Sequence, residues 1–150
     1  LPVDFNGQSK KSKILNIQTA KEAKKYLINN GVIIIFPSGG VSTASSLKSD
    51  AVDDAWKLFP AKLIHQTKTP VLPIFFDGKN GFLFHLFASK LNNQTLKYSS
   101  YIHETRKKIG QEIKIFSGNI IHYESLKVYQ NRNSLIKYLK NITYNLKNEK

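Results

Sequence analysis

The order of secondary-structure elements expected in this sequence predicts an α/β fold, with a largely parallel sheet flanked by helices. Two observations support this fold class. Residues 32–36 and 71–76 are uninterrupted apolar runs rich in Val, Ile and Phe, which is typical of strands covered on both faces. Segments with the apolar spacing of helices alternate with these runs. With 150 residues, 41% of them apolar, the chain is long enough for one domain with a substantial core.

In the first part of the chain, residues 1–5 are expected to form a short strand. A helix follows, capped by Thr19, because Glu22 stands three residues later in capping-box spacing. The Asn-Gly pair at 30–31 ends this helix. Residues 32–36 then form the central parallel strand.

The rest of the chain continues the alternation. We expect a short helix at 61–68, a second buried strand at 71–76, a helix at 101–108 and a strand at 112–117. Residues 134–148 predict a C-terminal amphipathic helix, since Leu and Ile fall on one side and Lys on the others. With no repeat or linker visible, residues 1–150 are expected to form a single domain.

The charge of the chain predicts an anionic partner. Its formal net charge is +13, from 23 Lys and Arg against 10 Asp and Glu, which suits nucleic acid, an acidic protein or an acidic lipid surface. The lysines are dispersed rather than gathered with aromatic residues, so no nucleic-acid partner is expected. The absence of cysteine excludes disulfides and thiolate chemistry. No apolar run approaches the roughly 20 residues that span a bilayer.

A glycine-rich loop directly after the first apolar run is the candidate ligand-binding site. Adjacent glycines let the backbone approach a ligand closely, and the amides of residues 39–42 and two serine hydroxyls offer hydrogen bonds to oxygen atoms. An ordinary strand-ending turn has the same composition. The loop matches neither the phosphate-binding P-loop nor the dinucleotide fingerprint. Its residues are Phe36, Pro37, Ser38, Gly39, Gly40, Val41 and Ser42.

Three ordered blocks in the sequence resemble the glycerolipid acyltransferases typified by 1-acylglycerol-3-phosphate acyltransferase. They are Leu-Pro-Val-Asp at 1–4, Phe-Pro-x-Gly-x-x-Ser at 36–42 and Thr-Pro-Val-Leu-Pro-Ile at 69–74. The resemblance is closest to the lysophospholipid and lyso-ornithine-lipid branch, sometimes labelled hemolysin-like, and reaches from residue 1 to about residue 121. It implies an O-acyltransferase of phospholipid biosynthesis, which moves a fatty acyl group from acyl-ACP or acyl-CoA to the hydroxyl of a lysophospholipid or related lyso-lipid. It implies no metal and no bound cofactor.

In that family a His-x-x-x-x-Asp motif supplies the catalytic base. Here Pro70, Lys90, Lys108 and Lys127 stand five positions after the four histidines, so none of these has its Asp. The resemblance therefore implies that the catalytic dyad lies upstream of Leu1 and that residues 1–150 are a truncated acyltransferase domain whose N-terminal part is missing.

The resemblance also assigns roles to residues of this chain. It implies that the 36–42 loop binds the acceptor and that Pro70, Val71 and Pro73 belong to the strand supporting it. Asp4 either orients the acceptor or makes a turn hydrogen bond. Residues 82–87, which are strongly apolar, line an acyl channel, touch the membrane or pack in the core.

The loop departs from the better-known members of the family. They carry Glu, Thr and Arg where this chain has Ser38, Gly40 and Val41. Bidentate phosphate binding by the loop is therefore not expected, which disfavours lysophosphatidic acid as the acceptor. Lys48 is a loose candidate for a nearby lysine that contacts the acceptor.

The expected location is the cytoplasmic face of an anionic membrane, with the protein peripheral or anchored through missing N-terminal sequence. The alternative is a non-catalytic basic domain that binds anionic lipid or, less readily, nucleic acid.

Overall fold

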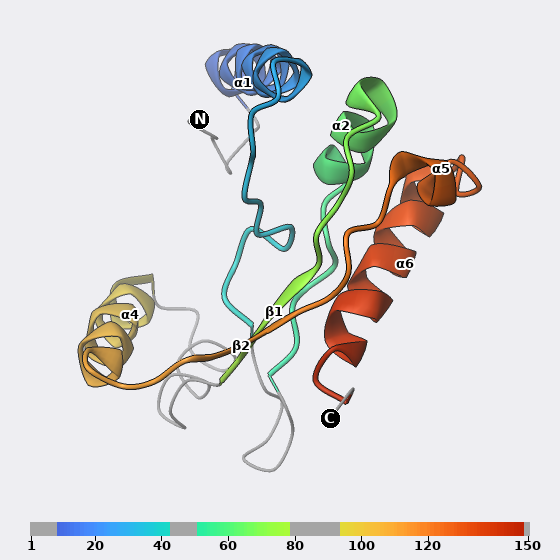
Figure 1. The fold of residues 1–150 in the computed structure, drawn as a ribbon. Helices are drawn as coiled ribbons and strands as arrows, with labels where there is room; N and C mark the ends of the chain where they lie inside the picture. The colour runs from blue at the N-terminus through green and yellow to red at the C-terminus, as the bar shows by residue number, and fades with distance from the viewer. Residues whose placement is uncertain (1–8, 43–50, 79–93, 149–150) are drawn as a thin grey trace.

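The computed structural model of the chain describes residues 9–42, 51–78 and 94–148 (Figure 1). The element order is α1 (Lys10–Ile28), α2 (Phe59–Thr67), β1 (Ile74–Asp77), α4 (Gln94–Lys108), β2 (Lys114–Ser117), α5 (Tyr123–Leu126) and α6 (Arg132–Asn145). In this part of the chain the fold is helix-rich and has one small sheet, made of β1 and β2. The expected strand at 1–5 and the apolar segment 82–87 lie outside the described residues.

The predicted largely parallel sheet flanked by helices is wrong. β1 and β2 form a two-stranded antiparallel ribbon, in which Phe75 lies opposite Phe116 and Phe76 opposite Ile115. The pairing resumes beyond the ribbon, where Val71 and Ile121 exchange N–H to O bonds of 2.9 and 2.8 Å. An apolar run shows that a segment favours extended backbone but does not show which segment it pairs with or in which direction. The prediction was therefore wrong about both the pairing partners and the parallel direction.

Residues 32–36 do not form the predicted central strand. The structure assigns them to no strand, although their burial alternates with the period of two expected of one. Val32 is 82% exposed and Ile34 77%, whereas Ile33 and Ile35 are half-buried. β-Branched side chains favour extended backbone, but a strand also needs hydrogen bonds from a neighbour.

The first helix begins earlier than predicted. Ser9 caps α1, since its hydroxyl accepts a hydrogen bond of 3.0 Å from the backbone N–H of Ser12. Thr19, the predicted cap, is buried inside the helix at 3% exposure. The end of the helix agrees with the prediction, because Asn30 has a φ of 61°, the left-handed conformation that stops a helix.

Helices α2 and α6 and strand β2 lie close to their predicted places, whereas α5 was not predicted. The structure has α2 where 61–68 was predicted and α6 where the C-terminal helix was expected, and α4 includes the predicted 101–108 but begins seven residues earlier. Pro60 lies in the first turn of α2. Proline suits this position because it lacks a backbone N–H, and an N–H in the first turn would have no partner within the helix. β2 occupies the last part of the predicted strand at 112–117.

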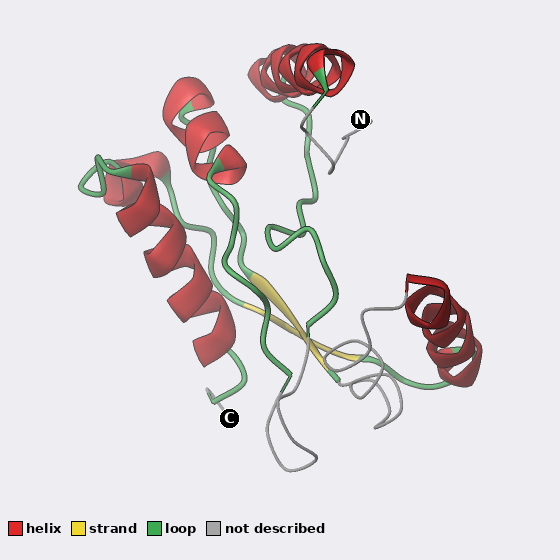
Figure 2. Cartoon of the chain, turned by 180° about the vertical axis from the view of Figure 1, so that it is seen from behind, coloured by secondary structure: helices red, strands yellow, loops and turns green. Residues whose placement is uncertain are grey.

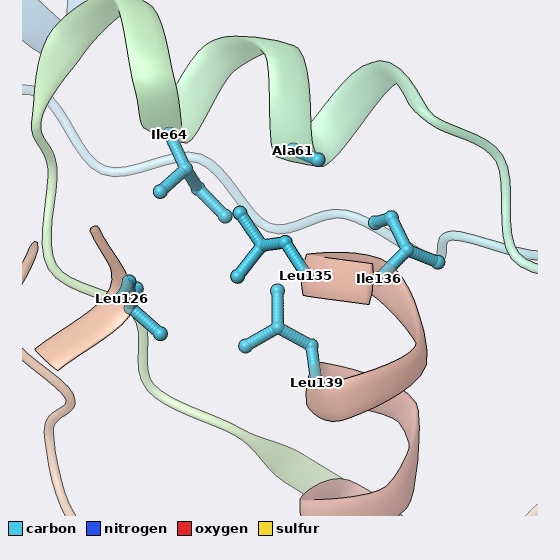
Figure 3. Close-up of a cluster of buried hydrophobic side chains, with 6 residues drawn as sticks. All are labelled: Ala61, Ile64, Leu126, Leu135, Ile136 and Leu139. Atoms are coloured by element: carbon cyan, nitrogen blue, oxygen red, sulfur yellow. The ribbon is translucent and has the colours of Figure 1, made fainter. Parts of the chain in front are cut away.

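The core lies where α2, α5 and α6 meet. Figure 3 shows the side chains pointing toward one another: Ala61 and Ile64 of α2, Leu126 of α5, and Leu135, Ile136 and Leu139 of α6. α1 packs beside α2 and buries its Ala23 completely. These contacts place α6 along one side of the ribbon, where the ring of Tyr144 lies 5.4 Å from that of Phe75.

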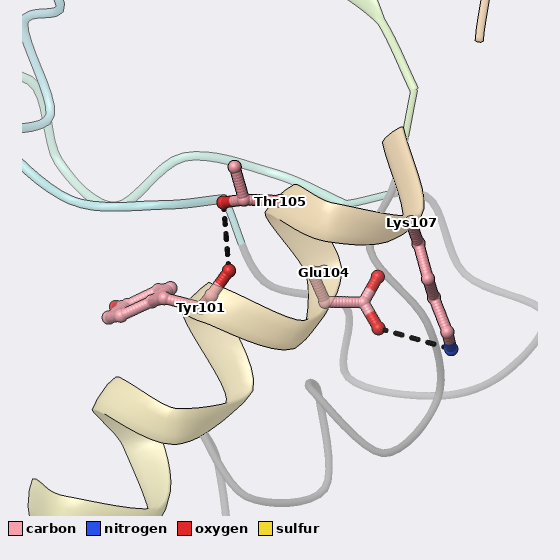
Figure 4. Close-up of polar contacts among 4 residues, drawn as sticks. All are labelled: Tyr101, Glu104, Thr105 and Lys107. Atoms are coloured by element: carbon pink, nitrogen blue, oxygen red, sulfur yellow. Dashed lines mark hydrogen bonds and ion pairs between the residues drawn. The ribbon is translucent and has the colours of Figure 1, made fainter. Parts of the chain in front are cut away.

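Figures 1 and 2, which view the chain from opposite sides, show α4 apart from the α2–α6 core. Two contacts join residues one turn apart along this helix (Figure 4). The Thr105 hydroxyl donates to the carbonyl of Tyr101 at 2.8 Å, and the Lys107 ammonium lies 3.7 Å from the Glu104 carboxylate. The ion pair, at i,i+3 spacing, stabilises the helix locally.

The packing predicts a large loss of stability for Leu135→Ala. Leu135 is 0% exposed, and truncating a leucine at such a site costs the transfer free energy of the removed carbons and that of the cavity left behind. We expect the free energy of unfolding, measured by urea denaturation, to fall by about 2–5 kcal/mol. Val128→Ala is the control, because Val128 is 72% exposed and its change should stay within about 0.5 kcal/mol. Equal midpoints for the two variants would contradict the assigned core.

Candidate functional site

The 36–42 loop is a tight turn that uses its own polar groups. Gly39 has a φ of 68°, a conformation open to glycine, and its N–H donates to the carbonyl of Phe36 at 3.2 Å. The Ser38 hydroxyl donates to the carbonyl of Gly40 at 2.9 Å and accepts from the N–H of Gly40 at 3.4 Å. Because Ser38 is buried and these amides are engaged, their described contacts hold the turn together.

The segment 53–57 closes this loop at both ends. The N–H of Lys57 donates to the carbonyl of Pro37 at 2.9 Å, at the start of the loop. At the end of the loop the Ser42 hydroxyl donates to Oδ1 of Asp53. The second carboxylate oxygen of Asp53, Oδ2, accepts from Nε1 of Trp56 at 2.8 Å. Both oxygens of this carboxylate therefore accept hydrogen bonds from neighbouring side chains.

Helix α6 holds the backbone of the same segment. The N–H of Asp53 donates to the Tyr144 hydroxyl oxygen at 2.8 Å. The Lys140 ammonium donates to the carbonyls of Asp53 and Asp54, at 2.8 and 3.1 Å, and lies 5.7 Å from the centre of the Tyr144 ring. We call Ser42, Asp53, Trp56, Lys140 and Tyr144 the Asp53 cluster. It joins three parts of the chain that are far apart in sequence.

The cluster lies partly out of water. Burial raises the pKa of the Tyr144 phenol above its ordinary value, and this effect outweighs the hydrogen bond from the Asp53 backbone, which lowers the pKa. The neutral phenol is therefore the form that the folded protein favours.

A cavity of about 440 Å³ adjoins the cluster. Its apolar wall includes Val52, Phe75 and the Tyr144 ring, and its polar part includes Asp77 and Lys147, whose charged atoms lie 3.9 Å apart. A cavity of this size lies within the range of small-molecule sites.

The structure places most of the predicted site residues. It brings the Phe36 ring 6.2 Å from that of Phe76 in β1, which sets the start of the loop beside the ribbon. Of the predicted supporting residues, Pro70 is exposed, Val71 pairs with Ile121, and Pro73 is buried. Asp4 and Lys48 lie outside the described residues.

The sequence interpretation missed the partners of the loop. Residues 42–59 are rich in Ser and Asp and show no clear helical or strand periodicity, so the sequence does not mark Asp53 or Trp56 as partners of the loop. Tyr144 stands 91 positions after Asp53, on a helix whose leucines dominated its interpretation. The one sequence signal for this contact is the hydroxyl of Tyr144 on the predicted amphipathic helix.

Two of the histidines in the described part of the chain, His65 and His122, lie in structural settings, and His85 lies outside the described residues. Among the described residues, no group of three or more His, Asp and Glu side chains is placed to hold a metal ion. His65 lies edge-on to Tyr123 with ring centres 6.3 Å apart, and His122 precedes α5 as its N-cap residue. Neither has the geometry of a His-Asp dyad.

In the described part of the chain, every helix is too short or too polar to cross a membrane. Comparisons of the sequence with protein-family models and with curated proteins, and of the structure with solved structures, found no match.

The raised pKa of Tyr144 predicts that Tyr144→Phe changes the pH dependence of stability. Because the folded-state pKa exceeds the unfolded one, stability contributed by the neutral phenol is present below about pH 10 and is lost as the pH rises through the folded-state value. At pH 8 the variant should be less stable by about 1 kcal/mol, because it removes the acceptor of the Asp53 N–H. The difference should shrink above pH 10. A difference in urea unfolding that stays constant between pH 8 and pH 11 would contradict this account.

Proposed function

We propose that the gene product containing these residues is an O-acyltransferase that moves a fatty acyl group from acyl-ACP or acyl-CoA to the hydroxyl of a lysophospholipid or related lyso-lipid. The observation that supports the proposal is the order and spacing of the blocks at 1–4, 36–42 and 69–74. In this reaction the acceptor oxygen attacks the thioester carbonyl carbon. The carbon–sulfur bond then breaks, and the thiol leaves with the proton taken from the acceptor hydroxyl.

The proposed roles follow the blocks. The 36–42 loop binds the acceptor, residues 70–73 support it, and Asp4 orients the acceptor. The contact between Phe36 and Phe76 is consistent with support of the loop by the chain that includes β1. A histidine with its Asp removes the proton, and because no histidine in this sequence has an Asp five positions later, the proposal assigns that dyad to sequence outside residues 1–150.

The proposed place of the reaction is the cytoplasmic face of an anionic membrane. The net charge of +13 supports this assignment, because interfacial lysines are attracted to acidic lipid headgroups. The same charge suits acyl-ACP and acyl-CoA, which are both acidic. The protein would bind peripherally or through an anchor outside these residues.

The loop composition predicts which acceptors are used. The gene product is incubated with labelled acyl-CoA or acyl-ACP and vesicles containing one lyso-lipid at a time. We expect transfer to lyso-lipids without a terminal phosphate monoester to be faster than transfer to lysophosphatidic acid, because Val41 cannot pair with that phosphate. Absence of an acylated product with every lyso-lipid and both donors would refute the proposed function.

Val41→Arg should shift this preference toward lysophosphatidic acid. Val41 is 45% exposed, so a longer side chain has access to solvent and to a bound headgroup. One charge-assisted hydrogen bond predicts a rise of about tenfold in kcat/KM for lysophosphatidic acid relative to the other lyso-lipids. Val41→Gln, which is long and uncharged, is the control. If the two variants show the same relative kcat/KM for lysophosphatidic acid, position 41 does not contact the acceptor headgroup.

A non-catalytic basic domain is the second candidate. The missing His-x-x-x-x-Asp motif favours it, and the net charge of +13 suits an anionic lipid surface, whereas the dispersion of the lysines weighs against nucleic acid. It requires salt-sensitive binding to anionic vesicles without acyl transfer, whereas a steep salt dependence of binding to DNA would point to nucleic acid.

A further inference from the structure

The contacts of Asp53 assign it a role in the acceptor site that the sequence blocks do not contain. Resting on the proposed acyltransferase function, we propose that Asp53 is a positioning residue. It fixes the Ser42 hydroxyl, and with it the end of the 36–42 loop, in the arrangement that binds the lyso-lipid acceptor.

The first step of the argument is the use of the carboxylate. Oδ1 accepts from the Ser42 hydroxyl and Oδ2 from Nε1 of Trp56 at 2.8 Å. A carboxylate whose two oxygens accept from fixed donors is held in one orientation. With these oxygens turned to the protein's own side chains, Asp53 acts on a bound acceptor through Ser42 rather than by taking its proton.

The second step is the rigidity of the support. The main chain at Asp53 is held on both sides, by the Tyr144 hydroxyl oxygen at its N–H and by the Lys140 ammonium at its carbonyl. Tyr144 and Lys140 lie on α6, whose Leu135 and Leu139 are anchored in the core. The position of Ser42 is thereby tied to the most buried part of the described chain.

The third step is the geometry of the loop. The carbonyl of Pro37 at one end accepts from the N–H of Lys57, and Ser42 at the other end donates to Asp53. The turn also has its own hydrogen bonds, at Phe36–Gly39 and Ser38–Gly40. The Asp53 tie is the one made by two side chains, so substitution can remove it while the backbone contacts remain.

The test is steady-state kinetics of the gene product with both substrates varied. Asp53→Ala and Ser42→Ala should each raise the KM for the lyso-lipid about tenfold and leave the KM for the acyl donor unchanged. The double variant should behave like either single variant, because the two residues act through one hydrogen bond. Ser42→Thr, which keeps the hydroxyl, should restore the acceptor KM to near the wild-type value.

Asp54→Ala is the matched control. It removes the neighbouring carboxylate, which belongs to an exposed residue, and keeps the Asp54 backbone carbonyl that accepts from the Lys140 ammonium. Its acceptor KM should equal that of the wild type. Circular dichroism of each variant checks that the helices remain, and Ser42→Ala provides the milder change if Asp53→Ala unfolds.

The contrary results are distinct from those that test the proposed function. A wild-type protein that acylates no lyso-lipid refutes the proposed function and the acceptor role together. An active wild type whose acceptor KM is unchanged in Ser42→Ala, or raised equally for both substrates, overturns the role of Asp53 alone. Additive effects in the double variant overturn it as well, since they show two independent contributions.

Discussion

The apolar packing of α6 against α2 is the interaction on which the contacts of the Asp53 cluster depend. Leu135 and Leu139 enter the core from one side of α6, and further along the same helix Tyr144 and Lys140 reach the backbone at Asp53. A helix held only by its polar contacts would exchange them for water at little cost. Burial of the leucines keeps α6 in place, and the hydrogen bonds then set the geometry of the loop.

Local signals in the sequence predicted the helices well and the sheet poorly. The spacing of apolar residues and the turn residues located α2, α4 and α6, because helical hydrogen bonds join residues four positions apart. The pairing of Phe76 with Ile115 joins distant segments and left no mark on either one alone. The start of α1 was missed for another reason: Ser9 and Thr19 are both good caps, and tertiary packing of α1 against α2 favours the longer helix.

In the candidate site, too, the sequence marked the local turn but not the distant residues that hold it. Glycines and hydroxyls marked the 36–42 loop, since a tight turn needs such residues at adjacent positions. The side chains that hold the loop come from other segments and have common identities, so nothing in composition distinguishes Asp53 from Asp54. Only the fold shows that one carboxylate is turned toward Ser42 and that the backbone at both is held by Lys140.

The open row of apolar side chains at residues 32–36 bears on how the protein behaves in solution. This five-residue stretch has no charge and no proline. Val32, Ile34 and Phe36 are exposed, and the Phe36 ring lies beside the ribbon. Such a segment is a template for strand addition by a second chain, which the lysine-rich surface opposes through repulsion between like-charged molecules. Raising the ionic strength screens that repulsion, so colloidal stability depends on the charge that the fold leaves on its surface.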